Sequence, residues 1–157
     1  MLLSIIRHGQ AQAQSNTGRD RDRTLTQLGH TQAQAVGQYL SKLQSPPTHI
    51  FASPYIRAQQ TALDICASLN LIPTTDNRLG ADQGLTEMHA LIEEHQDKHS
   101  IAIVSHMPTV GQLESLLTNG PASSGTSLWT GQVITLEIPD GELIANATVI
   151  DRYRLES

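Results

Sequence analysis

The chain has 157 residues, of which 38% are hydrophobic and only 3% aromatic, and its formal net charge is −5. This length predicts a single domain over residues 1–157, with a core of mainly aliphatic side chains. The acidic balance argues against a general affinity for nucleic acid or for an anionic membrane. No apolar run approaches the roughly 20 residues of a membrane span, and the run at 2–6 lacks the basic flank of a secretory signal. A single cysteine, Cys66, excludes an intramolecular disulfide, and we expect a cytoplasmic protein.

Strand-like and helix-like segments alternate along the chain, which is typical of an α/β protein with a largely parallel sheet. Strands are expected at 2–7, 48–52, near 73–76 and at 101–104, and helices at 26–44, 54–69, 84–97 and from Pro108 onward. Residues 129–138 and 143–150 are predicted to form an antiparallel edge hairpin with a turn at Pro139-Asp140-Gly141. The polar stretch 10–23 is predicted to be a long surface loop, and such loops often carry function.

Apolar stripes mark the faces of the first two predicted helices that we expect to be buried. Thr26 is the expected N-cap of the first of these helices. The stripes contain Leu28, Ala35, Val36, Tyr39, Leu40 and Leu43 in the first helix, and Ile56, Leu63, Cys66 and Leu69 in the second.

Three polar motifs each follow one of the apolar strand-like runs. They are Arg7-His8-Gly9, Ser53-Pro54-Tyr55-Ile56-Arg57 and Ser105-His106-Met107-Pro108. Ligands of open α/β sheets bind beyond the carboxyl ends of the strands. We therefore expect the two arginines and two histidines of these motifs to form one phosphate pocket that contains a nucleophile.

Each of these residues has a chemical role that suits phosphoryl transfer. The guanidinium groups of Arg7 and Arg57 can bind phosphate oxygens with forked hydrogen bonds. His8 can attack the phosphorus and form a phospho-imidazole, provided that an acceptor holds its other ring nitrogen as the donor. Gly9 allows the backbone to approach closely, and His106, as a protonated imidazole, can stabilise charge on the transferring group.

Other interpretations remain open for the same residues. A lone histidine at a strand end is often structural, and an isolated arginine in a first helical turn is often solvated, although a bound phosphate would favour Arg57 there. Arg23, at the end of the polar loop, is either a further phosphate ligand or a solvated charge. His95 and His99 have a metal-like spacing without an HExxH pattern, and no glycine-rich nucleotide motif is present, so we expect neither metal nor cofactor.

With these motifs the sequence resembles the histidine phosphatase superfamily, also called phosphoglycerate mutase-like. The family's Arg-His-Gly, Ser-Pro-x-x-Arg-Ala-x-Gln-Thr and Ser-His elements match Arg7-His8-Gly9, then Ser53, Pro54, Arg57, Ala58, Gln60 and Thr61, then Ser105-His106. The resemblance implies a three-layer α/β/α sandwich, with His8 as nucleophile and with Arg7, Arg57 and His106 around the phosphate.

Two further segments resemble the SixA-type phosphohistidine phosphatases within this superfamily. Residues 23–29 resemble the branch's Arg-Pro-Leu-Thr-x-x-Gly, with Thr24 in place of the proline, and residues 105–111 resemble its Ser-His-x-Pro-x-Val-Gly. This resemblance implies that Arg23 is an additional pocket arginine. Larger family members carry an acid that protonates an alkoxide leaving group. Glu87 is the candidate for that role here, although its spacing from Gly84 predicts an exposed helix face.

These observations predict a metal-independent phosphohistidine phosphatase with an intermediate on His8. The expected partner is a phosphorylated histidine-phosphotransfer domain or another phosphohistidine protein of a phosphorelay, and the enzyme is expected to be a monomer or weak dimer. The alternative is a phosphatase for a small phosphomonoester, such as a sugar phosphate or nucleotide, with Glu87 as acid. A less favoured alternative is a non-catalytic phosphate-binding module.

Overall fold

The computed structural model describes residues 1–156. Its centre is a six-stranded sheet with the order β3-β2-β4-β1-β5-β6. The strands are β1 (Leu2–Arg7), β2 (His49–Ala52), β3 (Thr74–Thr75), β4 (Ser100–Ser105), β5 (Val133–Glu137) and β6 (Thr148–Tyr153). The first four are mutually parallel, whereas β5 runs antiparallel to both β1 and β6. The predicted mostly parallel sheet with an antiparallel hairpin at its C-terminal edge is confirmed.

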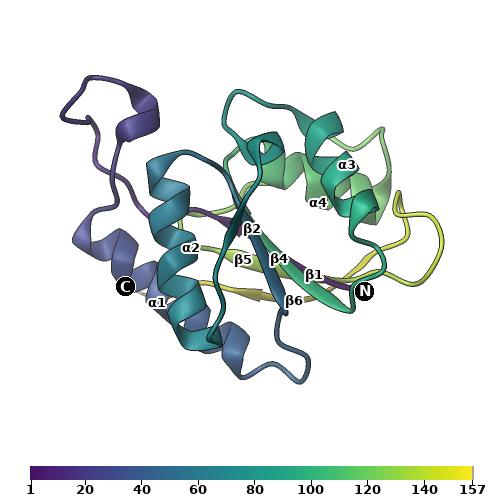
Figure 1. Ribbon diagram of the computed structural model, residues 1–157. Coiled ribbons are helices and arrows are strands. Elements are labelled where there is room, and N and C mark those ends of the chain that lie inside the picture. Colours follow the sequence, from purple (N-terminus) through teal and green to yellow (C-terminus); the bar gives the residue numbers. More distant parts are fainter. Residues whose placement is uncertain (157) are drawn as a thin grey trace.

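The α-helices of the described residues lie on the two faces of this sheet, and Figure 1 shows this arrangement. They are α1 (Gln27–Ser41), α2 (Ile56–Leu69), α3 (Leu85–Glu94) and α4 (Thr109–Asn119). One apolar cluster joins β1, β4 and β5 to α3 and α4, and a second joins the other face of the sheet to α1 and α2. The central strands β1 and β4 are therefore apolar on both faces, as expected for strands between two helical layers. The predicted three-layer α/β/α sandwich is confirmed.

The connection between β5 and β6 differs from the predicted tight turn. Residues 138–147 separate the two strands, and the segment 143–147 pairs with the end of α4 instead of extending β6. The N–H groups of Ala145 and Ala147 donate to the carbonyl oxygens of Leu116 and Leu117. Carbonyls in the last turn of a helix lack partners within the helix, and the Ala147 contact provides one for Leu117. The Leu116 carbonyl, which also accepts from Gly120 N–H, receives a second donor from Ala145. Leu143 and Ala147 of this segment are buried in the apolar cluster that includes α4, whereas Ile144 is 40% exposed.

The predicted burial of Leu28 and Leu63 is also wrong, since these side chains are 39% and 58% exposed. Small residues form much of the contact between α1 and α2 instead, and Gly37 illustrates how closely the helices approach. A methyl group on Gly37 would lie 2.9 Å from the carbonyl oxygen of Ile65. Because the hydrophobic periodicity counts large apolar residues, it misplaces the face of a helix that packs through glycine and alanine.

The remaining short elements lie in the loops. The polar stretch 10–23 contains a 3₁₀-helix, η1 (Asp20–Asp22), which contacts α2, and a second such turn, η2 (Asn77–Leu79), precedes α3. The loop with η1 extends beyond the helical layer in Figure 1. Within residues 1–156, no helix combines the length and the hydropathy that crossing a lipid bilayer requires.

Candidate active site

The parallel register brings the three sequence motifs to one edge of the sheet. Arg7, the last residue of β1, pairs with Ser105, the last residue of β4, and Ala52 at the end of β2 pairs with Val104. Two backbone hydrogen bonds continue this alignment beyond the strands, from His8 N–H to the Ser105 carbonyl and from Ser53 N–H to the Val104 carbonyl. The motifs therefore meet because the strands that precede them are neighbours in the sheet.

His8 is buried, and its two ring nitrogens have different partners. Nδ1 lies 2.8 Å from the carbonyl oxygen of Gly9, which can only accept, so Nδ1 carries the proton. Nε2 therefore carries no proton, and its electron pair accepts a hydrogen bond from Nε of Arg57 at 3.3 Å. Burial, followed by the charges of Arg57, Arg7 and Arg23, lowers the pKa of His8 to about 4, although the Gly9 contact opposes this shift. The imidazole is thus neutral near pH 7, with Nε2 available as a nucleophile.

Arg57, in the first turn of α2, lies at the centre of the cluster, and its side chain is 6% exposed. Its Nη1 donates to the backbone carbonyl of Asp20 at 2.9 Å, and its Nη2 donates to a carboxylate oxygen of the same residue at 3.1 Å. The alternative interpretation of Arg57 as a solvated helix residue is wrong. A buried guanidinium at a helix N-terminus has a strong requirement for an anionic partner.

His106 lies beside His8, with the two ring centroids 5.1 Å apart. Its Nε2 is 2.7 Å from the hydroxyl of Ser53, and its buried Nδ1 has no partner among the described residues. Burial and then the proximity of His8 and Arg57 lower the pKa of His106 to about 3. In this structure His106 is therefore neutral near pH 7, which differs from the protonated imidazole expected from the sequence. The physical reason is first burial, which disfavours the charged imidazole, and then the nearby His8 and the positive charges of Arg57 and Arg7.

The side chain of Arg7 is hydrogen-bonded to the loop that precedes β5. Its Nη1 donates to the carbonyl of Leu128 at 2.8 Å, whereas its buried Nε has no partner within residues 1–156. Burial and the charge of Arg57 lower the pKa of Arg7. A buried N–H without an acceptor is uncommon in folded proteins, and here it leaves one donor of Arg7 available beside His8.

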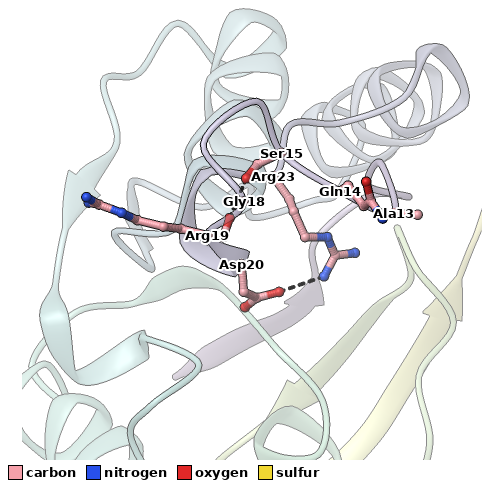
Figure 2. Close-up of a pocket in the computed structure, with 7 residues that line it drawn as sticks. All are labelled: Ala13, Gln14, Ser15, Gly18, Arg19, Asp20 and Arg23. Carbon is pink, nitrogen blue, oxygen red and sulfur yellow. Dashed lines mark hydrogen bonds and ion pairs between the residues drawn. The ribbon is translucent and has the colours of Figure 1, made fainter.

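Arg23 is joined to the same cluster through Asp20, which also contacts Arg57. Figure 2 shows the ion pair of Arg23 with Asp20. Its Nη1 donates to the Asp20 carboxylate at 2.8 Å, and its Nε donates to the carbonyl of Gln12 at 2.7 Å. Arg23 and Asp20 border a surface cavity of about 440 Å³, and the other lining residues are Ala13, Gln14, Ser15, Gly18 and Arg19. Arg23 is therefore ion-paired at the edge of the cluster, with its side chain 28% exposed.

The sequence motifs also contain positioning residues whose contacts only the structure reveals. The hydroxyl of Thr61 accepts from Gly9 N–H at 3.0 Å and donates to the Arg57 carbonyl at 2.7 Å, so it joins two of the motifs. The expected close approach at Gly9 is confirmed, because a methyl group there would lie 2.5 Å from the carbonyl oxygen of Gly29. Asp20 had no sequence signal beyond its place in the charged loop.

Tyr55 is a further residue of the cluster that the motifs had left without a role. Its ring lies edge-on to His106 at a centroid distance of 5.0 Å, and the guanidinium groups of Arg21 and Arg57 lie over it at 5.4 and 5.1 Å. Cations favour the face of an aromatic ring, so Tyr55 helps to hold Arg57 in place.

The hydroxyls of Ser53 and Ser105 and the candidate acid Glu87 make local contacts. The hydroxyl of Ser105 donates to the carbonyl of Leu79 at 2.7 Å, whereas that of Ser53 contacts His106. The carboxylate of Glu87 accepts from Gly84 N–H at 3.2 Å, which is a helix-capping contact at the start of α3. No group of three or more histidine, cysteine or acidic side chains suited to a metal occurs in the described part of the chain.

Comparison with known proteins agrees with this geometry. The sequence profile of the histidine phosphatase superfamily (branch 1) matches residues 3–90. The chain is 30% identical over 151 residues to the phosphohistidine phosphatase SixA homolog of Haemophilus influenzae, and the match covers 83% of this chain and 90% of that protein. A shorter match, 41% identical over 66 residues, joins 40% of this chain to 23% of the fructose-2,6-bisphosphatase TIGAR of Xenopus tropicalis.

The fold is also that of solved SixA structures. The structure of the protein histidine phosphatase SixA complexed with tungstate superimposes with a TM-score of 0.84 at 22% sequence identity, covering 98% of this chain and 97% of that one. The profile, the full-length relative and the shared fold agree with the three motifs at the sheet edge. The chain therefore belongs to the histidine phosphatase superfamily, and within it to the SixA-type branch.

Proposed function

We propose that this phosphatase removes phosphate from a phosphorylated histidine of a signalling protein, through an intermediate on Nε2 of His8. The observation that carries the proposal is the state of the His8 imidazole, with Nδ1–H bound to the Gly9 carbonyl and Nε2 beside Arg57. A neutral imidazole with a fixed tautomer is the form that attacks phosphorus.

The proposed reaction has two displacements. In the first, Nε2 of His8 forms a bond to phosphorus as the bond from phosphorus to the substrate nitrogen breaks, and the imidazole leaves with that electron pair. In the second, water attacks the phosphoryl group on His8 and releases inorganic phosphate. Arg7, Arg57 and Arg23 would bind the oxygens, and a bound dianion would oppose the charges that keep His106 neutral, so that His106 can gain a proton.

The same residues support a reaction without a metal ion. Arg57 contacts both His8 and Asp20, and Arg23 contacts Asp20. The charge of Arg7 also acts on His8. Together these guanidinium groups would supply the positive field that a transferring phosphoryl group needs. Imidazole is also a better leaving group than an alkoxide, so the reaction depends less on a general acid. The capping role of Glu87 fits this preference.

The test compares rates on two kinds of substrate in the presence of EDTA. We expect kcat/KM to be much higher for a phosphorylated histidine-phosphotransfer domain than for a panel of sugar phosphates and nucleotides. Acid-labile phosphate should be trapped on the wild-type enzyme during turnover. His8→Ala should keep its circular dichroism spectrum and lose both turnover and trapping, and retained turnover in that variant would contradict the mechanism.

The alternative is a small-molecule phosphomonoesterase, which the partial match to a fructose-2,6-bisphosphatase favours. It requires an acid for the alkoxide, and Glu87 is the candidate from the sequence. Glu87→Gln should leave the pH–rate profile for phosphomonoesters unchanged, because the carboxylate caps α3. If the wild-type rate falls at high pH and this fall is absent in Glu87→Gln, Glu87 acts as the general acid, which would support the alternative.

A further inference from the structure

One carboxylate lies between Arg57, which contacts the proposed nucleophile, and Arg23 at the edge of the cluster. One oxygen of Asp20 accepts from Arg57 at 3.1 Å and the other accepts from Arg23 at 2.8 Å. With the Asp20 carbonyl and His8 as the other acceptors, every N–H-bearing nitrogen of Arg57 has a partner. Asp20 therefore uses the donors that a phosphate group would need.

The loop that carries Asp20 is held by its own hydrogen bonds. The hydroxyl of Ser15 donates to the carbonyl of Arg19 at 2.7 Å, and that of Thr17 donates to the carboxylate of Asp22 at 2.6 Å. Figure 2 shows Asp20 pointing from this loop toward Arg23. The Asp20 side chain is 58% exposed, so it can move away from the arginines without disturbing the core.

Asp20 stays ionised at neutral pH. The hydrogen bond from Arg23, followed by the charge of Arg57, lowers the pKa of this carboxyl despite partial desolvation. A carboxylate of this kind cannot donate a proton to a leaving alkoxide. It repels a dianionic phosphate that enters the same cluster, and it attracts a cationic or N–H-bearing group of the substrate.

We propose that Asp20 determines specificity by competing with compact oxyanions for Arg23 and Arg57 while accepting the ring N–H of a protonated phosphohistidine. This inference rests on the proposed function and adds the residue that selects the substrate class. A phosphate dianion or a simple monoester has only oxygens to offer and must displace the carboxylate. A phosphohistidine ring protonated on its second nitrogen provides the displaced carboxylate with a new donor.

This contact also suits the first displacement. As the phosphorus–nitrogen bond breaks, its electron pair returns to the ring nitrogen, while the other ring nitrogen keeps its proton. The imidazole then leaves as a neutral molecule and needs no further acid. By accepting a hydrogen bond from this ring N–H, the Asp20 carboxylate favours the protonated phosphohistidine, and imidazole departs from that form as a neutral molecule.

The test measures phosphate binding and substrate selectivity in Asp20→Asn, with Asp22→Asn as the matched control. Asp22 lies in the same 3₁₀-helix, and its carboxylate binds Thr17 rather than an arginine. We expect Asp20→Asn to bind inorganic phosphate about tenfold more tightly by isothermal titration calorimetry, because one like charge is removed. The ratio of kcat/KM for phosphohistidine to that for para-nitrophenyl phosphate should fall about tenfold or more in the same variant. Both quantities should be unchanged in Asp22→Asn.

The phosphate-binding and selectivity measurements separate this inference from the proposed function. Unchanged or weaker phosphate binding in Asp20→Asn would show that Asp20 supports the arginines rather than competing for them, and would overturn the inference. If the wild-type enzyme prefers phosphohistidine and Asp20→Asn keeps that preference, the role of Asp20 is contradicted while the proposed function stands. A wild-type preference for sugar phosphates or nucleotides over phosphohistidine would contradict the proposed function, and with it this selectivity.

Discussion

Thr61 shows how one hydroxyl can hold two catalytic motifs in register. It accepts from the backbone N–H that follows His8 and donates to the carbonyl of Arg57, in a fully buried position. Its sequence motif matched the family, yet no pattern showed which backbone groups it would reach. A side-chain contact across 52 residues depends on how the strands align, so it requires the tertiary structure.

Thr61→Val should reduce both stability and activity. The isosteric change leaves Gly9 N–H buried without an acceptor, and this costs roughly 1–3 kcal/mol in the free energy of unfolding. Urea denaturation measures the loss, and kcat/KM should fall because the backbone beside His8 is no longer held. Thr31→Val is the matched control: Thr31 also donates to a carbonyl four residues earlier, but it is exposed and has no second contact. Equal losses in the two variants would show that the Gly9 contact contributes nothing.

At the scale of elements, the start of α1 packs directly against the strand-end loop. A methyl group on Gly29 would lie 2.1 Å from the carbonyl oxygen of Gln10, and Gly29 itself limits the space at Gly9. The helical periodicity of 26–44 is enough to predict this helix and its N-cap Thr26, which accepts from Gly29 N–H. It cannot reveal that two glycines must meet, because the contact joins separate elements.

Gly29→Ala and Gly37→Ala should therefore have different consequences for activity. Both place a methyl group against backbone of another segment, and the contact is much closer at Gly29. We expect each variant to lose stability, even though alanine favours helix by about 1 kcal/mol over glycine. Gly29→Ala should also lower kcat, since it displaces the loop after His8, whereas Gly37→Ala should affect only thermal denaturation. An unchanged kcat in a folded Gly29→Ala protein would argue against coupling between α1 and the site.

At the scale of the whole molecule, the two buried histidines couple stability to pH. Their pKa values, about 4 for His8 and about 3 for His106, lie below the ordinary value of 6.5. At a pH between the lowered pKa of each histidine in the folded protein and its ordinary pKa of 6.5, the unfolded chain binds more protons than the folded one. Stability should therefore fall as the pH is lowered from about 6.5 toward 4.

Urea denaturation at about pH 7 and about pH 4.5 measures this effect. The loss should be on the order of 2–3 kcal/mol for His8 alone in this interval. Replacing both histidines by glutamine should remove most of the pH dependence above about pH 5. A midpoint that is independent of pH in the wild-type protein would show that the histidines are not kept neutral by burial.

The sequence by itself determined the α/β class, most strands and helices to within a few residues, and the three motifs at the ends of β1, β2 and β4, whereas it placed the starts of β5 and β6 too early. These features follow from local patterns: apolar runs, helical periodicity, and polar residues placed just beyond a strand. The tertiary structure alone decided the contact of Asp20 with both arginines, the tautomer of His8, the neutral state of His106 and the packing of 143–147 on α4. Each of these depends on groups from distant segments and on the burial that the assembled fold imposes, and no local pattern encodes that combination.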